Sequence, residues 1–146
     1  MNYAKLVNKV LDIAIHQKGV NTAFDQNVYQ LNSIDVQYPV FNVSPTEPQI
    51  ERDSYMEFVL TLYYIDREQY SNNEAHNPDT TIIHSNGISI LSNIIKKLNE
   101  DMDILEIDDY INYVCWSDTE IFADRCNGVY CTIHVKVPKD TRCSVD

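Results

Sequence analysis

The side chains of this chain that can do chemistry are its cysteines, its histidines and a cluster of carboxylates. Ten, four and eleven residues separate the successive cysteines, Cys115, Cys126, Cys131 and Cys143. A structural zinc site needs close pairs of ligands such as C-x-x-C, and the chain has none. We therefore predict free thiols and no metal site. A disulfide, Cys126–Cys131 or Cys115–Cys143, is the alternative that a thiol titration tests.

The four histidines are scattered, and none has the spacing of a metal-binding motif. A thiol with an imidazole beside it can act as a nucleophile with its base, and Cys115 or Cys131 with His134 would supply the two groups. The residues around them carry no catalytic signature. We therefore expect no catalytic residues. The four histidines should be surface or structural side chains: His16, His76, His84 and His134.

Six carboxylates lie close together in the second half of the chain, at Glu100, Asp101, Asp103, Glu106, Asp108 and Asp109. An EF-hand calcium loop needs a central glycine, and this segment has none. We interpret the cluster as a solvated turn, or as an acidic surface for a partner or a lumen. The chain has only 3 glycines, so a loop that cradles phosphate is not expected either, and we predict no cofactor.

The net charge and the length of the chain exclude further classes of partner and of domain organisation. The formal net charge is −11, and residues 51–146 carry 18 acidic and 8 basic side chains, a net of −10. Such a chain has no general attraction for DNA, RNA or anionic lipid. No run of 18 apolar residues is present, so no membrane partner is expected. The length of 146 residues suits a single domain, residues 1–146.

The apolar pattern predicts the elements that position these groups. Apolar residues recur at helical spacing over 3–17 and 80–99, and they alternate over 54–66 and 129–137. Weaker strand patterns cover 28–34, 37–43 and parts of 100–124. Pro39 makes the strand at 37–43 either an edge strand or an irregular one. Asn127-Gly128 indicates a tight turn. We expect a mobile loop or arm at 67–80 and a loose tail at 139–146.

The longest strand pattern assigns its side chains to two faces. Met56, Phe58, Leu60, Leu62 and Tyr64 form the face that should meet the core, and the other face is mixed and partly exposed. With the two helices, this predicts an α+β fold. We expect an antiparallel sheet of about four to six strands with both helices packed on one face.

In this order of elements the chain resembles the phage tail-terminator and neck (tail-completion) proteins. The likeness runs from the amphipathic helix at 3–17 through the strand at 55–63 and the helix at 88–98 to the closing strand at 128–137. It rests on element order and size, which is a likeness of fold. The abundance of Asn, Ile and Tyr also suggests an AT-rich genome, such as that of a crAss-like phage.

The resemblance implies a tail-terminator-like fold and a virion structural protein without enzymatic activity. Such proteins are made in the host cytoplasm and form homo-oligomeric rings, sixfold or twelvefold, at the neck or tail top. They contact other neck and tail proteins around the channel through which DNA passes without being bound. The acidic stretch 100–109 and the 67–80 loop are not part of the family pattern, and they would be surfaces for a partner ring.

Within this hypothesis the end of the long strand is the expected subunit interface. Tyrosine is unusually frequent, with 10 copies, and it is enriched at protein interfaces. The interface residues we predict are Tyr63, Tyr64, Asp66, Arg67 and Tyr70. The alternatives are a monomeric acidic adaptor that binds a basic protein and a small cytoplasmic α+β enzyme.

Overall fold

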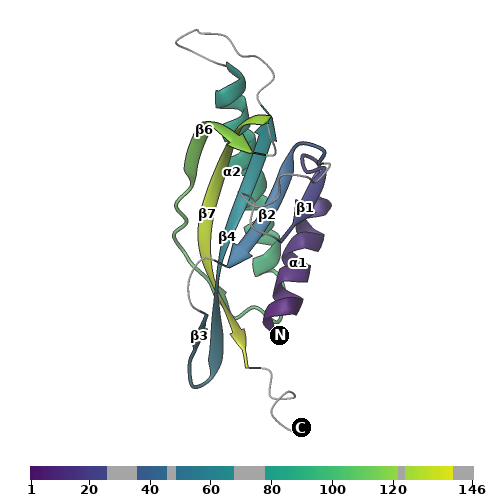
Figure 1. Cartoon of the computed structure of the whole chain (residues 1–146). Helices are drawn as coiled ribbons and strands as arrows, with labels where there is room; N and C mark the ends of the chain where they lie inside the picture. Colours follow the sequence, from purple (N-terminus) through teal and green to yellow (C-terminus); the bar gives the residue numbers. More distant parts are fainter. Residues whose placement is uncertain (26–35, 46–48, 68–77, 122–123, 140–146) are drawn as a thin grey trace.

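The protein is a mixed β-sheet with two helices on one of its faces (Figure 1). The structure is a computed structural model that describes residues 1–25, 36–45, 49–67, 78–121 and 124–139. The seven strands have the order β1-β2-β4-β7-β5, with β3 paired to β4 and β6 paired to β7. In chain order the elements are α1 (Tyr3–Ile15), β1 (Thr22–Phe24), β2 (Val40–Pro45), β3 (Ile50–Glu51), β4 (Tyr55–Arg67), α2 (Pro78–Asn99), β5 (Glu106–Ile107), β6 (Val114–Ile121) and β7 (Asp124–Pro138).

The centre of the sheet is the long antiparallel pair of β4 and β7. Leu62 lies opposite Cys131 and Leu60 opposite Ile133, so the apolar faces of the two strands coincide. Because successive side chains alternate, this register places the whole apolar set of both strands on one side. The predicted core face of β4 is thereby confirmed.

Both helices cover that apolar face, as the sequence predicted. The buried side chains of α1 recur at helical spacing, and Asn2 caps the helix by accepting a hydrogen bond from the backbone N–H of Lys5 at 2.9 Å. They join buried side chains of α2 and of the sheet in a single core. The helical contributions to that core are Leu6, Val7, Val10, Ala14, Ile83, Leu91, Ile94 and Leu98.

The sheet differs from the expected antiparallel sheet of four to six strands. The described residues form seven strands, and β1 runs parallel to β2, with Thr22 opposite Val40. Parallel neighbours need a connection of about a dozen residues or more, and the chain between positions 25 and 39 provides that length. The sequence showed no periodicity strong enough to reveal this short parallel strand.

Two local predictions were wrong. The strand expected at 37–43 begins only after Pro39, whose bond to Tyr38 is cis, and β2 lies between β1 and β4 rather than at an edge. Asn127 and Gly128 lie within β7 and not in a turn. The strand expected at 28–34, residues 68–77 of the expected loop and residues 140–146 of the expected tail lie outside the described residues.

The second face of the sheet is less exposed than the alternation predicted. Val59, Thr61 and Ile65 of β4 are each at most 2% exposed. Asn42 of β2 is also fully buried on this face, and neither its Oδ1 nor its Nδ2 atom has a hydrogen-bond partner in the described chain. Burying an amide without hydrogen-bond partners costs free energy, so Asn42 lowers the stability of the folded state.

All three glycines are sites of close packing, Gly87 and Gly128 beside β4 and Gly19 against Ile90 of α2. A Cβ atom on Gly87 of α2 would lie 2.7 Å from Val129 Cγ2 and 2.8 Å from Tyr64 Cδ1. A Cβ atom on Gly128 would collide with the Tyr64 carbonyl oxygen and the Trp116 ring. None of the three has a positive φ. The glycines are therefore required by space and not by backbone conformation.

We predict that Gly87→Ala lowers the free energy of unfolding by about 1–3 kcal/mol, because the added methyl overpacks the contact between α2 and the sheet. At an exposed helical site the same change would stabilise the protein. Urea unfolding measures the difference, with Ser85→Ala on the exposed side of α2 as the control. A more stable Gly87→Ala protein would contradict the close packing.

We also predict that Asn42→Leu, which is close to isosteric, raises the free energy of unfolding by about 1–3 kcal/mol. The change removes two buried polar groups that have no partner. The midpoint of urea unfolding at constant m-value is the readout. A loss of stability would show instead that the amide is satisfied in solution, for example by a buried water.

Candidate functional site

The predicted interface residues at the end of β4 separate onto the two faces of the sheet. Tyr64 and Asp66 point to the helix side, whereas Tyr63 and Arg67 point to the opposite side, because side chains alternate along a strand. Tyr63 lies beside Tyr130 with the ring centroids 5.6 Å apart, and the Arg67 guanidinium lies over the Tyr38 ring at 5.6 Å. These residues therefore do not form one patch.

Tyr64 is the member of the set that the structure corrects. Its side chain is 1% exposed and packs beneath α2 against Gly87. It belongs to the core and cannot contact a neighbouring subunit, so its replacement by Ala would damage the fold itself. Tyr63 and Asp66 are half-buried and Arg67 is exposed, while Tyr70 lies outside the described residues.

A cleft of about 350 Å³ opens on the helix side of this strand end. The segment after α1, the middle of α2 and the last residues of β4 form its walls, with contributions from Lys18, Gly19, Pro39, Tyr64, Asp66, Asn86, Ser89 and Ile90. Gly19 lies so close to α2 that a Cβ atom there would be 2.6 Å from Ile90 Cδ1. Close packing of this segment against α2 thus defines one wall.

The polar groups of the cleft are suited to binding. Burial raises the pKa of Tyr64, and the nearby Asp66 adds to the shift, so the phenol stays protonated at neutral pH. Burial also raises the pKa of Asp66, against the opposing effects of the Arg67 backbone N–H and guanidinium. Because Tyr64 is buried, the cleft offers the Asp66 carboxylate and the Ser89 hydroxyl as hydrogen-bonding groups, with no activated nucleophile among them.

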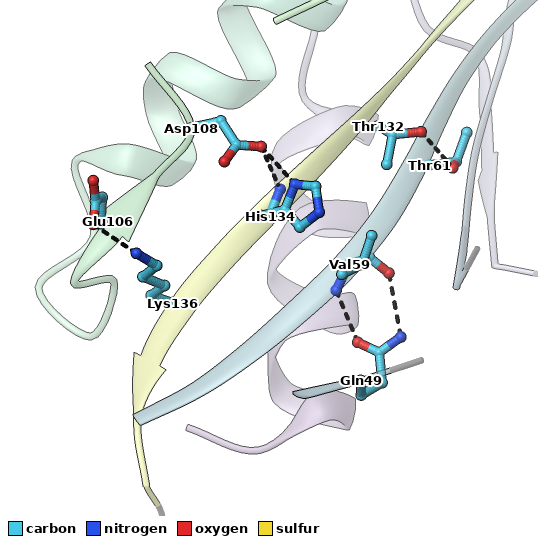
Figure 2. A network of polar contacts seen from close by, with 8 residues as sticks. All are labelled: Gln49, Val59, Thr61, Glu106, Asp108, Thr132, His134 and Lys136. Carbon is cyan, nitrogen blue, oxygen red and sulfur yellow. Dashed lines mark hydrogen bonds and ion pairs between the residues drawn. The ribbon is translucent and has the colours of Figure 1, made fainter. Parts of the chain in front are cut away.

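The acidic segment 100–109 is not a uniform acidic surface. Three of its carboxylates hold the segment to the rest of the protein. Asp101 pairs with Lys9 of α1, Glu106 Oε2 lies 3.1 Å from Lys136 Nζ, and Asp108 Oδ2 lies 2.8 Å from His134 Nδ1. The His134 backbone N–H also donates to Asp108 at 2.9 Å. Figure 2 shows Glu106 and Asp108 reaching across to β7.

The register of the sheet accounts for these pairs. Glu106 lies opposite Lys136 in the β5–β7 ladder, and the same register carried past β5 brings Asp108 to His134.

Figure 2 also shows that the Gln49 amide bonds both backbone groups of Val59. The Val59 N–H donates to Oε1 at 2.8 Å, and Nε2 donates to the Val59 carbonyl at 3.3 Å. Side chains therefore close the gaps that short strands leave along the central pair.

The remaining carboxylates of the segment, Glu100, Asp103 and Asp109, are exposed and form no ion pair with described residues. Exposed apolar side chains accompany them. Met102 is 97% exposed and Tyr110 is 78% exposed, and Leu105 and Val114 are also exposed. We call residues 100–114 the outer strip, because β5 and β6 pair with the outer side of β7 (Figure 1).

The nucleophile and base considered for an enzyme are not brought together. Cys131 is buried in the core, and burial raises the pKa of its thiol to about 12. His134 is on the opposite face of β7 and is hydrogen bonded to Asp108. Cys115 pairs with Val129, about 17 Å along the strand from His134 at ~3.3 Å per residue. Neither thiol can use this imidazole.

Cys115, Cys126 and Cys131 have reduced thiols rather than disulfides, and Cys143 lies outside the described residues. No group of three or more His, Cys, Asp or Glu side chains within the described ranges is placed to hold a metal ion. Among the described helices, none is both long and apolar enough to span a membrane.

No protein-family model matches the chain, and no curated protein is similar to it.

The sequence analysis did not predict the cleft, nor the ion pairs that join the acidic segment to the rest of the protein. The cleft joins residues that are far apart in the chain, from Lys18 to Ile90. The partners of Glu106 and Asp108 depend on strand register, which the two-residue strand β5 does not reveal. The alternation of His134 and Lys136 on β7 was the one available signal, since it places two basic side chains on one face of the strand.

We predict a pH-dependent contribution from the Asp101–Lys9 pair. Lys9 lowers the pKa of Asp101 in the folded state, so the pair stabilises the fold above the unfolded-state pKa of about 3.9. That contribution is lost as the pH falls through the folded-state pKa. Asp101→Asn, which keeps the Oδ1 acceptor for the Asp103 N–H, should lower the free energy of unfolding at pH 7 by about 1 kcal/mol or less.

The difference between Asp101→Asn and the wild type should shrink from pH 7 to an acid pH below the folded-state pKa of Asp101, where both side chains are neutral. Asp103→Asn is the matched control, because Asp103 is exposed. An equal effect at both pH values would contradict the ion pair as its source.

Proposed function

We propose that this protein is a virion structural protein that forms a ring at the neck or tail top of a phage. In that position it would join head to tail or terminate the tail, around the channel through which DNA leaves. This proposal extends the resemblance in element order, and the outer strip is the observation that carries it.

The outer strip has the composition of a protein-contact surface. Four of the seven large apolar side chains that are exposed in the described chain lie within it: Met102, Leu105, Tyr110 and Val114. Exposed apolar side chains that cluster, rather than being scattered singly, are typical of an interaction site. The outer edge of β6, which follows the strip, has no strand partner among the described residues. Unpaired edges of this kind pair readily with another chain.

The net charge supports a channel role. With −11 per chain, a ring of identical copies would repel the phosphates of DNA that passes through it. A passage of this kind requires DNA to move without being held. The unpaired carboxylates Glu100, Asp103 and Asp109 would supply this charge at the lumen or toward a neighbouring ring.

A monomeric acidic adaptor is the second candidate, and the same unpaired carboxylates favour it. In that case the outer strip would bind a basic protein, and binding would weaken steeply with salt. The two functions differ in one property: a ring protein associates with its own copies, whereas an adaptor remains a monomer until its partner is present.

We predict that the purified protein forms a closed ring. Light scattering gives the mass, and negative-stain imaging gives the symmetry, which should be sixfold or twelvefold. Leu105→Glu, which adds a charge to the exposed apolar part of the outer strip, should weaken assembly, while Ile82→Glu on exposed α2 should not. A strictly monomeric protein at every concentration, which captures basic proteins, would favour the adaptor.

A further inference from the structure

The hairpin of β3 and β4 projects from the lower end of the sheet, beyond the two helices (Figure 1). The Arg52 N–H donates to the Tyr55 carbonyl at 2.9 Å, which closes the turn. Glu51 pairs with Lys139 at 3.2 Å and braces the hairpin against the end of β7. The hairpin is therefore a formed arm of the fold.

The tip of this arm carries two opposite charges without partners. Arg52 and Asp53 are exposed, and neither side chain forms an ion pair or hydrogen bond with another described residue. A cationic and an anionic group thus stand side by side at the most distant point of the arm.

The cleft beside Asp66 presents the complementary pair of charges. Asp66 accepts a hydrogen bond from the Arg67 backbone N–H at 2.8 Å, but the Arg67 guanidinium lies over Tyr38 and makes no ion pair with it. Lys18, at the rim of the same cleft, also has no ion pair in the described chain. Pro39 and Ile90 add apolar surface between these charges.

Distance prevents the arm from filling the cleft of its own subunit. The arm begins at Tyr55 and the cleft lies at Asp66 of the same strand, and eleven steps of ~3.3 Å separate them by about 36 Å. The two features therefore lie near opposite ends of β4. Only another molecule can bring an arm tip into this cleft.

We propose that the Arg52–Asp53 tip of one copy docks in the cleft of a second copy, with Arg52 against Asp66 and Asp53 against Lys18. This inference rests on the proposed ring function and identifies the contact between neighbours. The stem of Arg52 lies over Pro39 and Ile90, as long basic side chains do on apolar surface. The cleft volume of about 350 Å³ is at the lower end of ligand pockets, which suits one inserted side chain.

The contact joins different surfaces on the two partners, so it is heterologous. A heterologous contact repeats from copy to copy and closes into a ring when its rotation allows. It also solves an electrostatic problem, since chains with a net charge of −11 repel one another unless opposite charges meet locally.

The test compares assembly of the wild type with that of charge variants by light scattering. Arg52→Glu and Asp66→Lys should each raise the concentration needed for assembly at least about tenfold. Lys97→Glu makes the same change in net charge as Arg52→Glu, at an exposed site of α2, and should leave assembly unchanged. Circular dichroism and urea unfolding establish that each variant is folded.

Mixing the two single variants gives the sharpest result. Arg52→Glu retains a normal cleft and Asp66→Lys retains a normal arm, so one junction between them has the wild-type charges and the next has both charges reversed. The mixture should therefore assemble into rings in which the two variants alternate, although neither variant assembles alone. The double variant, with both charges reversed, should recover assembly. Asp66→Asn serves in place of Asp66→Lys if the latter does not fold, and it should weaken assembly without forming a reversed pair.

The outcomes separate this inference from the proposed function. If the wild type forms rings that Arg52→Glu and Asp66→Asn leave unchanged, the arm does not dock in the cleft, although the ring function stands. If the wild type is monomeric at all concentrations, both are overturned. Loss of assembly in the single variants, with recovery in the double variant, supports both.

Discussion

The close approach of α2 to the β4–β7 pair is the contact on which the other features depend. Gly87 allows α2 to lie directly on Tyr64 and Val129, and Gly128 leaves room for the Trp116 ring beside the β4 backbone. Any side chain at either position would force the layers apart. Because protein interiors are packed densely, such a shift would spread through the apolar face that both helices share. The position of Tyr64, and with it the floor of the cleft, follows from these two glycines.

Around this centre, polar side chains compensate for strands that end early. The Gln49 amide occupies the gap between β3 and β2 and satisfies both backbone groups of Val59. Asp108 and Glu106 fasten the outer strip to β7, and Asp101 fastens its beginning to α1. Asn42 is the exception in the described chain, since it is buried without a partner. The acidic segment is thus partly structural, and only its unpaired carboxylates remain for contact with another molecule.

The surfaces proposed for assembly have one property in common: each can offset the repulsion between acidic copies of the chain. A strongly acidic chain can associate with its own copies only where apolar surface or opposite charges offset the repulsion. The outer strip supplies exposed apolar side chains, and the arm and cleft supply opposite charges that form no ion pair with the described residues of their own subunit. These features lie on separate parts of the molecule, as a repeating heterologous contact requires.

The sequence by itself determined the two helices, the long strand and the choice of its core face, because the spacing of Leu6, Val10, Leu60 and Leu62 records which side is buried. It also determined the net charge, which argues against nucleic-acid binding. Tertiary structure alone decided what the glycines do, since Asn127-Gly128 has the pattern of a turn but lies within a strand where another layer approaches. It also decided that Tyr64 belongs to the core, that β1 runs parallel to β2, and that Asp66 and Lys18 line one cleft. These outcomes depend on register and on contacts between residues far apart in the chain, and no local pattern of residue types encodes them.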